Sequence, residues 1–139
     1  MSAPAVAVST DGKTLAAAWK DVRDERPRVW WASGPSAKLP AEVSVGPPRD
    51  VLQDHPSLAL GDGGVFWLAW EEGVGAARRL RCNLSAPKAT PREVADMSQG
   101  APAFPVIACG AGLAIVAWES ASADAGERVF ARVIDDARR

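Results

Sequence analysis

The strongest constraint in this chain is a motif that occurs three times. Each copy contains an apolar stretch led by proline, a short turn containing glycine, and a second apolar stretch that ends in Ala-Trp. The repeated prolines and tryptophans are Pro4, Pro56 and Pro102, and Trp19, Trp70 and Trp118. The prolines lie 52 and 46 residues apart and the tryptophans 51 and 48, which gives a period of about 50 residues. Such a period indicates a repeat architecture in which each unit is one small structural element.

Every unit predicts the same series of β-strands. The turns supply the glycines that a tight hairpin needs, and the strands on either side are apolar at almost every position, which is typical of strands covered on both faces. Third strands open with arginine and are more polar, and no stretch has a sustained helical period. The expected strands are 4–9, 56–61 and 102–109, then 14–19, 65–70 and 113–118, then those opening at Arg28, Arg79 and Arg128, and short fourth strands at 42–45 and 92–95.

The chain is therefore expected to be all-β, with three β-propeller blades of four antiparallel strands in a single domain, 1–139. The blades are expected at about 1–51, 52–99 and 100–139, the last without a clear fourth strand. Three blades are too few to close a ring and leave an apolar sheet face bare at each end. We expect a homodimer to complete six blades with two-fold symmetry. A fragment of a longer propeller would show the same pattern.

Composition excludes several classes of partner and cofactor. The 16 basic and 17 acidic residues nearly cancel, and no basic stripe recurs, so nucleic acid is not an expected partner. The longest apolar run, 110–118, is too short to span a membrane.

Cys82 and Cys109 fall at unrelated places in their units, so we expect two thiols rather than a disulfide framework or a metal site, and no cofactor. Met1 leads directly into the first repeat without a visible signal peptide, which leaves the cytoplasm or the mature part of an exported protein, and the Ala- and Arg-rich composition is typical of bacteria.

The Ala-Trp segments, each followed by an acidic residue, resemble those of the sialidase-like, or BNR-repeat, propellers. They read Ala18-Trp19-Lys20-Asp21, Ala69-Trp70-Glu71-Glu72 and Ala117-Trp118-Glu119. The resemblance covers the whole chain and implies six blades of four antiparallel strands around a central channel. Near 33–40 and 85–92, where the family carries its Asp-box, only the leading serine is present. The chain also contains no tyrosine, the nucleophile of sialidases, and no Phe/Tyr-Arg-Ile-Pro motif, so the resemblance implies the fold without the sialidase chemistry.

Charged residues concentrate in the loops that a propeller gathers at one mouth of its channel. The candidate ligand-binding residues there are Asp21, Asp54, His55, Glu71, Glu72 and Glu119. His55 is the only histidine, and Asp54-His55 precedes a repeat proline, so this pair is a candidate acid/base group or a hydrogen-bonded structural element. Three of the acidic residues, Asp21, Glu71 and Glu119, follow the repeated tryptophans and are expected either to form a ring of carboxylates that binds a cation or a polyol, or to solvate the strand ends.

The tryptophans divide into two groups. Trp19, Trp70 and Trp118 recur in register and are expected in the core between blades. Trp30 and Trp31 are adjacent, and strand alternation predicts that they point to opposite faces of their sheet.

The leading hypothesis is a non-catalytic propeller module that binds a carbohydrate or a protein, with no catalytic residue assigned. One alternative is a sialidase-like glycoside hydrolase whose active site forms across the dimer. Without tyrosine it would recruit Glu71, Glu72 or Asp21 as nucleophile. The other alternative is a purely structural half-propeller.

Overall fold

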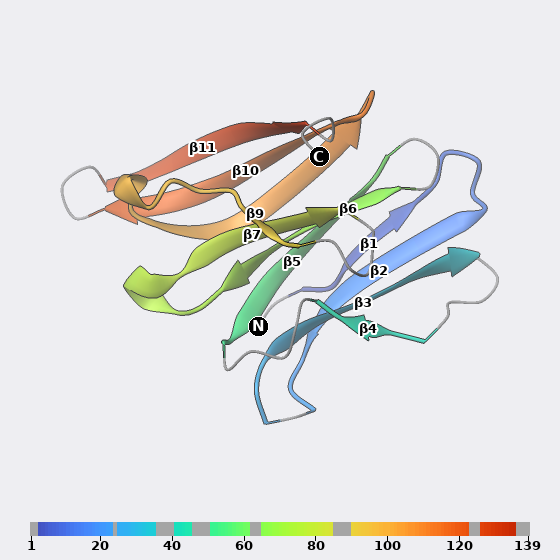
Figure 1. Cartoon of the computed structure of the whole chain (residues 1–139), viewed down its shortest axis with the longest axis horizontal. Coiled ribbons are helices and arrows are strands. Elements are labelled where there is room, and N and C mark those ends of the chain that lie inside the picture. Colours follow the sequence, from blue (N-terminus) through green and yellow to red (C-terminus); the bar gives the residue numbers. More distant parts are fainter. Residues whose placement is uncertain are drawn as a thin grey trace.

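A computed structural model describes residues 3–23, 25–35, 41–45, 51–61, 65–84, 90–122 and 126–135, which form three antiparallel sheets (Figure 1). The first sheet has the order β1 (Ala5–Val8), β2 (Thr14–Asp21), β3 (Arg28–Pro35), β4 (Val43–Ser44), and the second has β5 (Gln53–Leu60), β6 (Phe66–Glu72), β7 (Arg79–Leu84), β8 (Arg92–Glu93). The third sheet consists of β9 (Ala101–Gly110), β10 (Leu113–Ser122) and β11 (Gly126–Asp135). Two short 3-10 turns, η2 (Gly75–Ala77) and η3 (Met97–Gln99), are the helical elements of the described residues, which confirms the all-β expectation. None of these is long and apolar enough to cross a bilayer.

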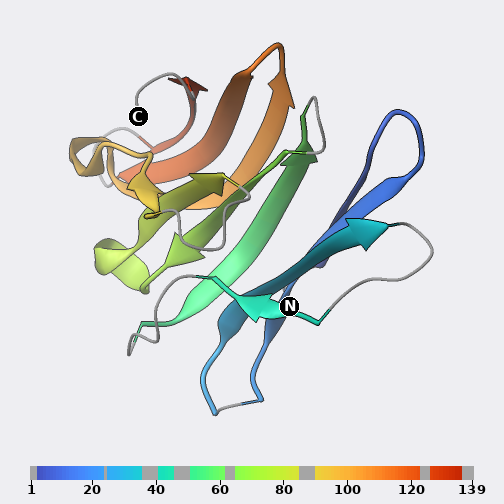
Figure 2. The same ribbon diagram turned by 45° about the vertical axis from the view of Figure 1, so that its right-hand side comes forward.

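The second sheet lies between the other two, and the sheets fan out from one side (Figure 2). The first strand of each sheet lies beside the first strand of the next, so β5 contacts both β1 and β9. One hydrogen bond joins two of these strands directly: the Ile107 N–H donates to Ser57 Oγ at 3.1 Å. This arrangement places the strands that open each unit along one side of the molecule.

Strand β6 is buried along its whole length because both faces of its sheet are covered. Trp67 and Ala69 point toward the third sheet, where Leu80 and Val116 complete the core. On the opposite face the core extends to the first sheet and contains Ala16, Ala18, Val29, Phe66, Leu68 and Trp70. The continuous apolar pattern of this strand is thus explained by a neighbouring sheet on each side.

The third sheet departs from the expectation that every second strand is covered on both faces. Along β10, Ala114, Val116 and Trp118 are buried against the second sheet, whereas Leu113 and Ile115 are exposed on the other face. The expectation fails here because no sheet of the described chain lies against that face.

Strand register also corrects the alignment of the third repeat. Ala5, Ser57 and Val106 each pair with the alanine of an Ala-Trp segment. The equivalent prolines are therefore Pro4, Pro56 and Pro105, and the assignment of Pro102 as the third repeat proline was wrong. The error arises because β9 contains two prolines three residues apart, and an irregularity in its pairing with β10 shifts the register between them.

The two adjacent tryptophans confirm the predicted alternation. Trp31 packs edge-on against Phe66, with ring centroids 4.9 Å apart, in the core between the first two sheets. Trp30 lies on the opposite face, where the guanidinium of Arg23 covers its ring at 4.2 Å. Of the repeated tryptophans, Trp70 and Trp118 are buried between sheets, as expected, and Trp19 is partly exposed on the first sheet's open side.

The two thiols should differ sharply in reactivity. Cys82 is 1% exposed, and burial raises its pKa to about 12, whereas Cys109 is partly exposed. In the native chain a thiol reagent at neutral pH should modify Cys109 and reach Cys82 only after unfolding. Because the folded pKa exceeds the unfolded value of about 8.5, stability should also fall as pH rises from about 8.5 toward 12.

Mass spectrometry of the labelled protein assigns the site, and Cys109→Ala should abolish native labelling. Cys82→Ala should reduce the alkaline loss of stability, measured as the denaturant midpoint against pH. Equal labelling rates for both thiols in the native chain would contradict this account of the core.

Gly100, in the connection that leads into β9, should not tolerate a side chain. Its φ is 100°, and a Cβ there would lie 2.6 Å from the carbonyl oxygen of Ala121. Gly112 is the matched control, since its φ is 75° but a Cβ would meet nothing within 4 Å. In chemical denaturation, Gly112→Ala should cost about 1 kcal/mol for the positive φ alone, and Gly100→Ala about 3 kcal/mol. Equal losses would show that the connection does not pack as described.

Candidate functional site

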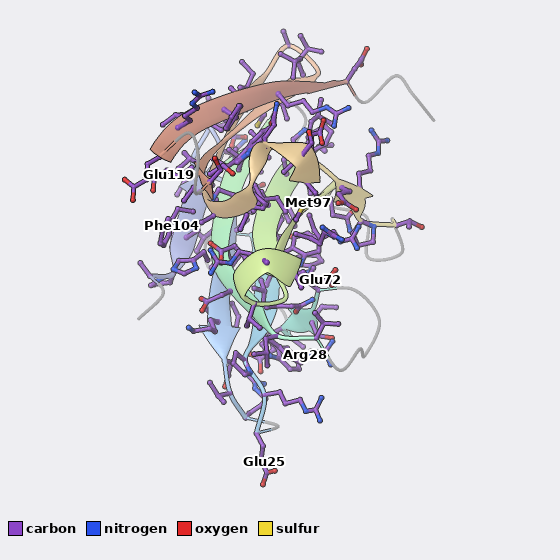
Figure 3. All side chains as sticks on the ribbon, turned by 90° about the vertical axis from the view of Figure 1, so that its left-hand side faces the viewer. Glu25, Arg28, Glu72, Met97, Phe104 and Glu119 are labelled. Atoms are coloured by element: carbon purple, nitrogen blue, oxygen red, sulfur yellow. The ribbon has the colours of Figure 1, made fainter. Side chains whose placement is uncertain are left out.

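The candidate site lies at the end of the sheets where β2, β6 and β10 end. Figure 3 looks onto this end, with Phe104 and Glu119 toward one side and Glu72 nearer the middle. The loops between second and third strands open here, as do the connections from one sheet to the next. Charged side chains from two neighbouring sheets therefore meet at this end.

A buried carboxylate, Glu71, occupies the boundary between the second and third sheets. Its side chain is 4% exposed. Oε1 accepts a hydrogen bond from the Phe104 N–H at 2.7 Å and lies 3.1 Å from His55 Nδ1, while Oε2 is 3.3 Å from Arg78 Nε. Although Nδ1 is this close, the ring is not oriented for a hydrogen bond. These nitrogen groups offset the cost of removing the carboxylate from water.

A second polar contact links the first and second sheets. Lys20 Nζ, at the end of β2, donates to Asp54 Oδ2 at 2.7 Å. The other oxygen of Asp54 accepts a hydrogen bond from the His55 N–H, also at 2.7 Å. Asp54 thus positions the backbone of the histidine that faces Glu71.

His55 and Phe104 share an unusual backbone conformation. Their φ angles are 46° and 52°, and each residue directly precedes a repeat proline. The two rings meet edge to face with centroids 4.7 Å apart. Holding a residue other than glycine in this region costs about 1 to 3 kcal/mol, and it persists only where surrounding contacts enforce it. Glu71 supplies such contacts, because it touches the His55 ring and binds the Phe104 N–H.

The structure brings together three of the candidate site residues: Asp54, His55 and Glu71. Glu72 points to the opposite face of the second sheet, where it accepts a hydrogen bond from Arg81 Nε at 2.8 Å. Glu119 is exposed on the third sheet's open side.

Asp21 also lies apart from the cluster. Its carboxylate binds Arg23, and this hydrogen bond holds the pKa of Asp21 below its usual value. Arg23 in turn covers Trp30, which places the pair on the face of the first sheet that is turned away from the second.

The pairing of the strands shows that the expected ring of three carboxylates does not form. The residues that directly follow the repeated tryptophans, and so are equivalent, are Lys20, Glu71 and Glu119. Asp21 corresponds instead to Glu72, one position further on, and points to the other face. A cation therefore stands at the first position, where the ring would need a carboxylate.

The site includes three residues that sequence reasoning did not select: Lys20, Arg78 and Phe104. Lys20 was detectable, because it follows Trp19 directly. Phe104 was also detectable, because Phe104-Pro105 matches His55-Pro56. Arg78 carried no such signal, since it precedes β7 by one residue and only the fold turns it toward Glu71.

Other features of the described residues do not coincide with this site. These residues contain no group of three or more His, Cys, Asp or Glu side chains that could hold a metal ion. One hollow lies between β8 and β11, lined by Arg92, Val94 and Arg132, and another lies beside Cys109 and Trp67. The candidate site therefore consists of the ion pairs Lys20–Asp54 and Arg78–Glu71 beside the exposed ring of Phe104.

Two solved structures that are similar to this chain are glycoside hydrolases with a propeller-type fold. One, described as a glycoside hydrolase, has a TM-score of 0.58 and 10% sequence identity, over 92% of this chain and 31% of that one. The other is the α-L-arabinanase of Penicillium chrysogenum complexed with arabinobiose, with a TM-score of 0.56 and 12% identity, over 96% of this chain and 57% of that one. The chain therefore spans about a third of the first protein and just over half of the second.

At these identities the likeness shows the fold alone. No family model matches the sequence, and a comparison with curated proteins finds no match.

Removing the charge of Glu71 should destabilise the chain. Glu71→Gln loses the ion pair with Arg78 inside the protein, which we expect to cost about 3 kcal/mol. Glu93→Gln is the matched control, because Glu93 pairs with Arg79 and Arg81 at 3.5 Å but is 41% exposed, and we expect a cost below about 1 kcal/mol. Urea denaturation measures both, and similar losses would contradict the structural role of Glu71.

Proposed function

We propose that the chain is a non-catalytic propeller module that binds carbohydrate beside Glu71, at the boundary between the second and third sheets. The observation that carries this proposal is the cluster itself, in which one buried carboxylate contacts a partly exposed imidazole and binds the N–H of Phe104, whose phenyl ring is exposed. Carbohydrate sites combine an aromatic surface for the apolar face of a sugar with fixed polar groups for its hydroxyls.

The surrounding side chains provide suitable polar groups. Lys20 and Arg78 are partly exposed cations that can donate to hydroxyl oxygens, and Asp54 is a partly exposed acceptor. Each is held by an ion pair, so little conformational freedom is lost on binding. Paired positive and negative groups favour a neutral sugar over a strongly charged ligand.

Glu71 itself acts in this proposal as a positioning residue. Both of its oxygens are occupied, and its side chain is nearly excluded from solvent. A nucleophile needs an oxygen that can approach an anomeric carbon, so these contacts argue against covalent catalysis by Glu71.

Glycoside hydrolysis is the second candidate, because the proteins with this fold named above are glycoside hydrolases. It would require a pair of carboxylates flanking a sugar. Glu71 and Glu72 point to opposite faces of the second sheet, so they do not form such a pair within one chain. A panel of chromogenic glycosides, including α-L-arabinofuranosides, should therefore show no turnover.

Binding can be tested by titration calorimetry with arabinobiose and a series of neutral oligosaccharides. We expect weak, saturable binding to at least one neutral sugar, and a loss of at least tenfold in affinity for His55→Ala and for Phe104→Ala. Val74→Ala, which truncates an exposed apolar side chain in the loop after β6, should leave the affinity unchanged.

Binding that persists in both site variants would place the sugar elsewhere, and silence across the series would overturn the proposal. Turnover of a glycoside that disappears in Glu71→Gln, with the fold retained by circular dichroism, would instead establish hydrolysis.

A further inference from the structure

Each end of the three-sheet stack presents an open apolar face. The open face of the third sheet, turned away from the second, carries Val106, Leu113, Ile115, Val129 and Val133. The open face of the first sheet, at the other end, carries Val6 and Val8 together with the partly exposed Leu15 and Trp19. Faces of this kind on both ends of one chain indicate contacts with another protein surface.

The open face of the third sheet matches a face that is already buried in the chain. Val129 pairs with Glu119 across the third sheet, and Leu80 pairs with Glu71 across the second. Because Glu119 and Glu71 occupy equivalent positions, Val129 and Leu80 are equivalent too. Leu80 is 0% exposed in the core between the second and third sheets, whereas Val129 is 75% exposed. Ile115 corresponds in the same way to the buried Trp67. The third sheet therefore offers the kind of face by which the second sheet binds its neighbour.

The open face of the first sheet matches the complementary side of those interfaces. Val6 is equivalent to Leu58 and Ile107, since each lies opposite the residue that precedes the Ala of an Ala-Trp segment. Leu58 and Ile107 are 9% and 6% exposed because each packs against the preceding sheet, while Val6 is 61% exposed. The two open faces are thus the two halves of an interface that the chain forms twice internally.

A polar contact repeats along with the apolar cores. In both internal interfaces, the residue after the repeated tryptophan forms a hydrogen bond with the next sheet. Lys20 donates to Asp54, and Glu71 accepts from the Phe104 N–H. Glu119 holds the equivalent position on the third sheet and is exposed. The residue equivalent to Phe104 on the first sheet is Ala3, which precedes Pro4. Glu119 is therefore placed to accept a hydrogen bond from the Ala3 N–H of a sheet docked against it.

We propose that a second copy of this chain docks the open face of its first sheet on the open face of the third, and that the reciprocal contact closes a ring of six sheets. The two contacts are identical, and each continues an interface already formed twice within the chain. A head-to-tail contact that closes on itself buries both ends of each copy and leaves no apolar face for further growth.

The mass in solution, measured by light scattering without any ligand, tests this proposal independently of sugar binding. The unaltered chain should have twice the 14.6 kDa mass of one copy. Val129→Asp and Val6→Asp, one on each open face, should each give single copies with an unchanged circular dichroism spectrum. Val74→Asp is the matched control, because Val74 is 60% exposed but lies in a loop, and it should remain a pair.

Glu119→Ala tests the polar contact without placing a charge on the apolar face. It also tests whether two copies pair through these faces if an aspartate variant fails to fold. It should raise the dissociation constant of the pair about tenfold. A folded single copy at all concentrations, or assemblies that grow beyond two copies, would overturn the proposal. A pair that survives both aspartate variants, or whose dissociation constant is unchanged in Glu119→Ala, would also overturn it.

Discussion

The stacking of apolar sheet faces is the interaction on which the rest of the structure depends. The second sheet has five consecutive apolar residues in β6, Phe66 to Trp70, which alternate between its two faces, so neither face is stable in water. The first and third sheets cover these faces, and the two cores that result account for most of the fully buried side chains. The two sheets at the ends each have one face that no sheet of the described chain covers, and the proposed pairing of two copies would bury both of these faces.

The polar groups at the ends of the strands follow from this stacking. Once apolar contacts bring two sheets together, the residue after each repeated tryptophan lies beside the first strand of the next sheet, where Lys20 and Glu71 make their contacts. Glu71 also stabilises the positive φ of Phe104 and contacts the His55 ring, so the buried carboxylate and the strained backbone depend on each other. A structural contact between sheets thereby holds two potential ligand-binding side chains in place.

Much of this architecture could be predicted from periodicity, because each repeat carries its own strands, turns and core residues. The strands and the alternation of Trp30 and Trp31 needed only that pattern. One assignment failed for a physical reason: an irregularity in the pairing of β9 with β10 shifts the register by an amount that residue spacing does not reveal, and Pro102 was consequently aligned in place of Pro105. Asp21 was placed in the ring because it is acidic, although Lys20 is the residue that directly follows Trp19.

The amino-acid sequence by itself determined that the chain forms repeated antiparallel sheets, since strand propensity, turn glycines and apolar runs are local properties. It also placed Trp70 and Trp118 on faces between sheets, whereas Trp19, which has the same pattern, is partly exposed on the open side of the first sheet. Only the tertiary structure decided which charges meet, because Arg78, His55 and the Phe104 N–H reach Glu71 from three separate segments. The same is true of the open faces, whose exposure depends on which sheets are present to cover them and not on the residues that form them.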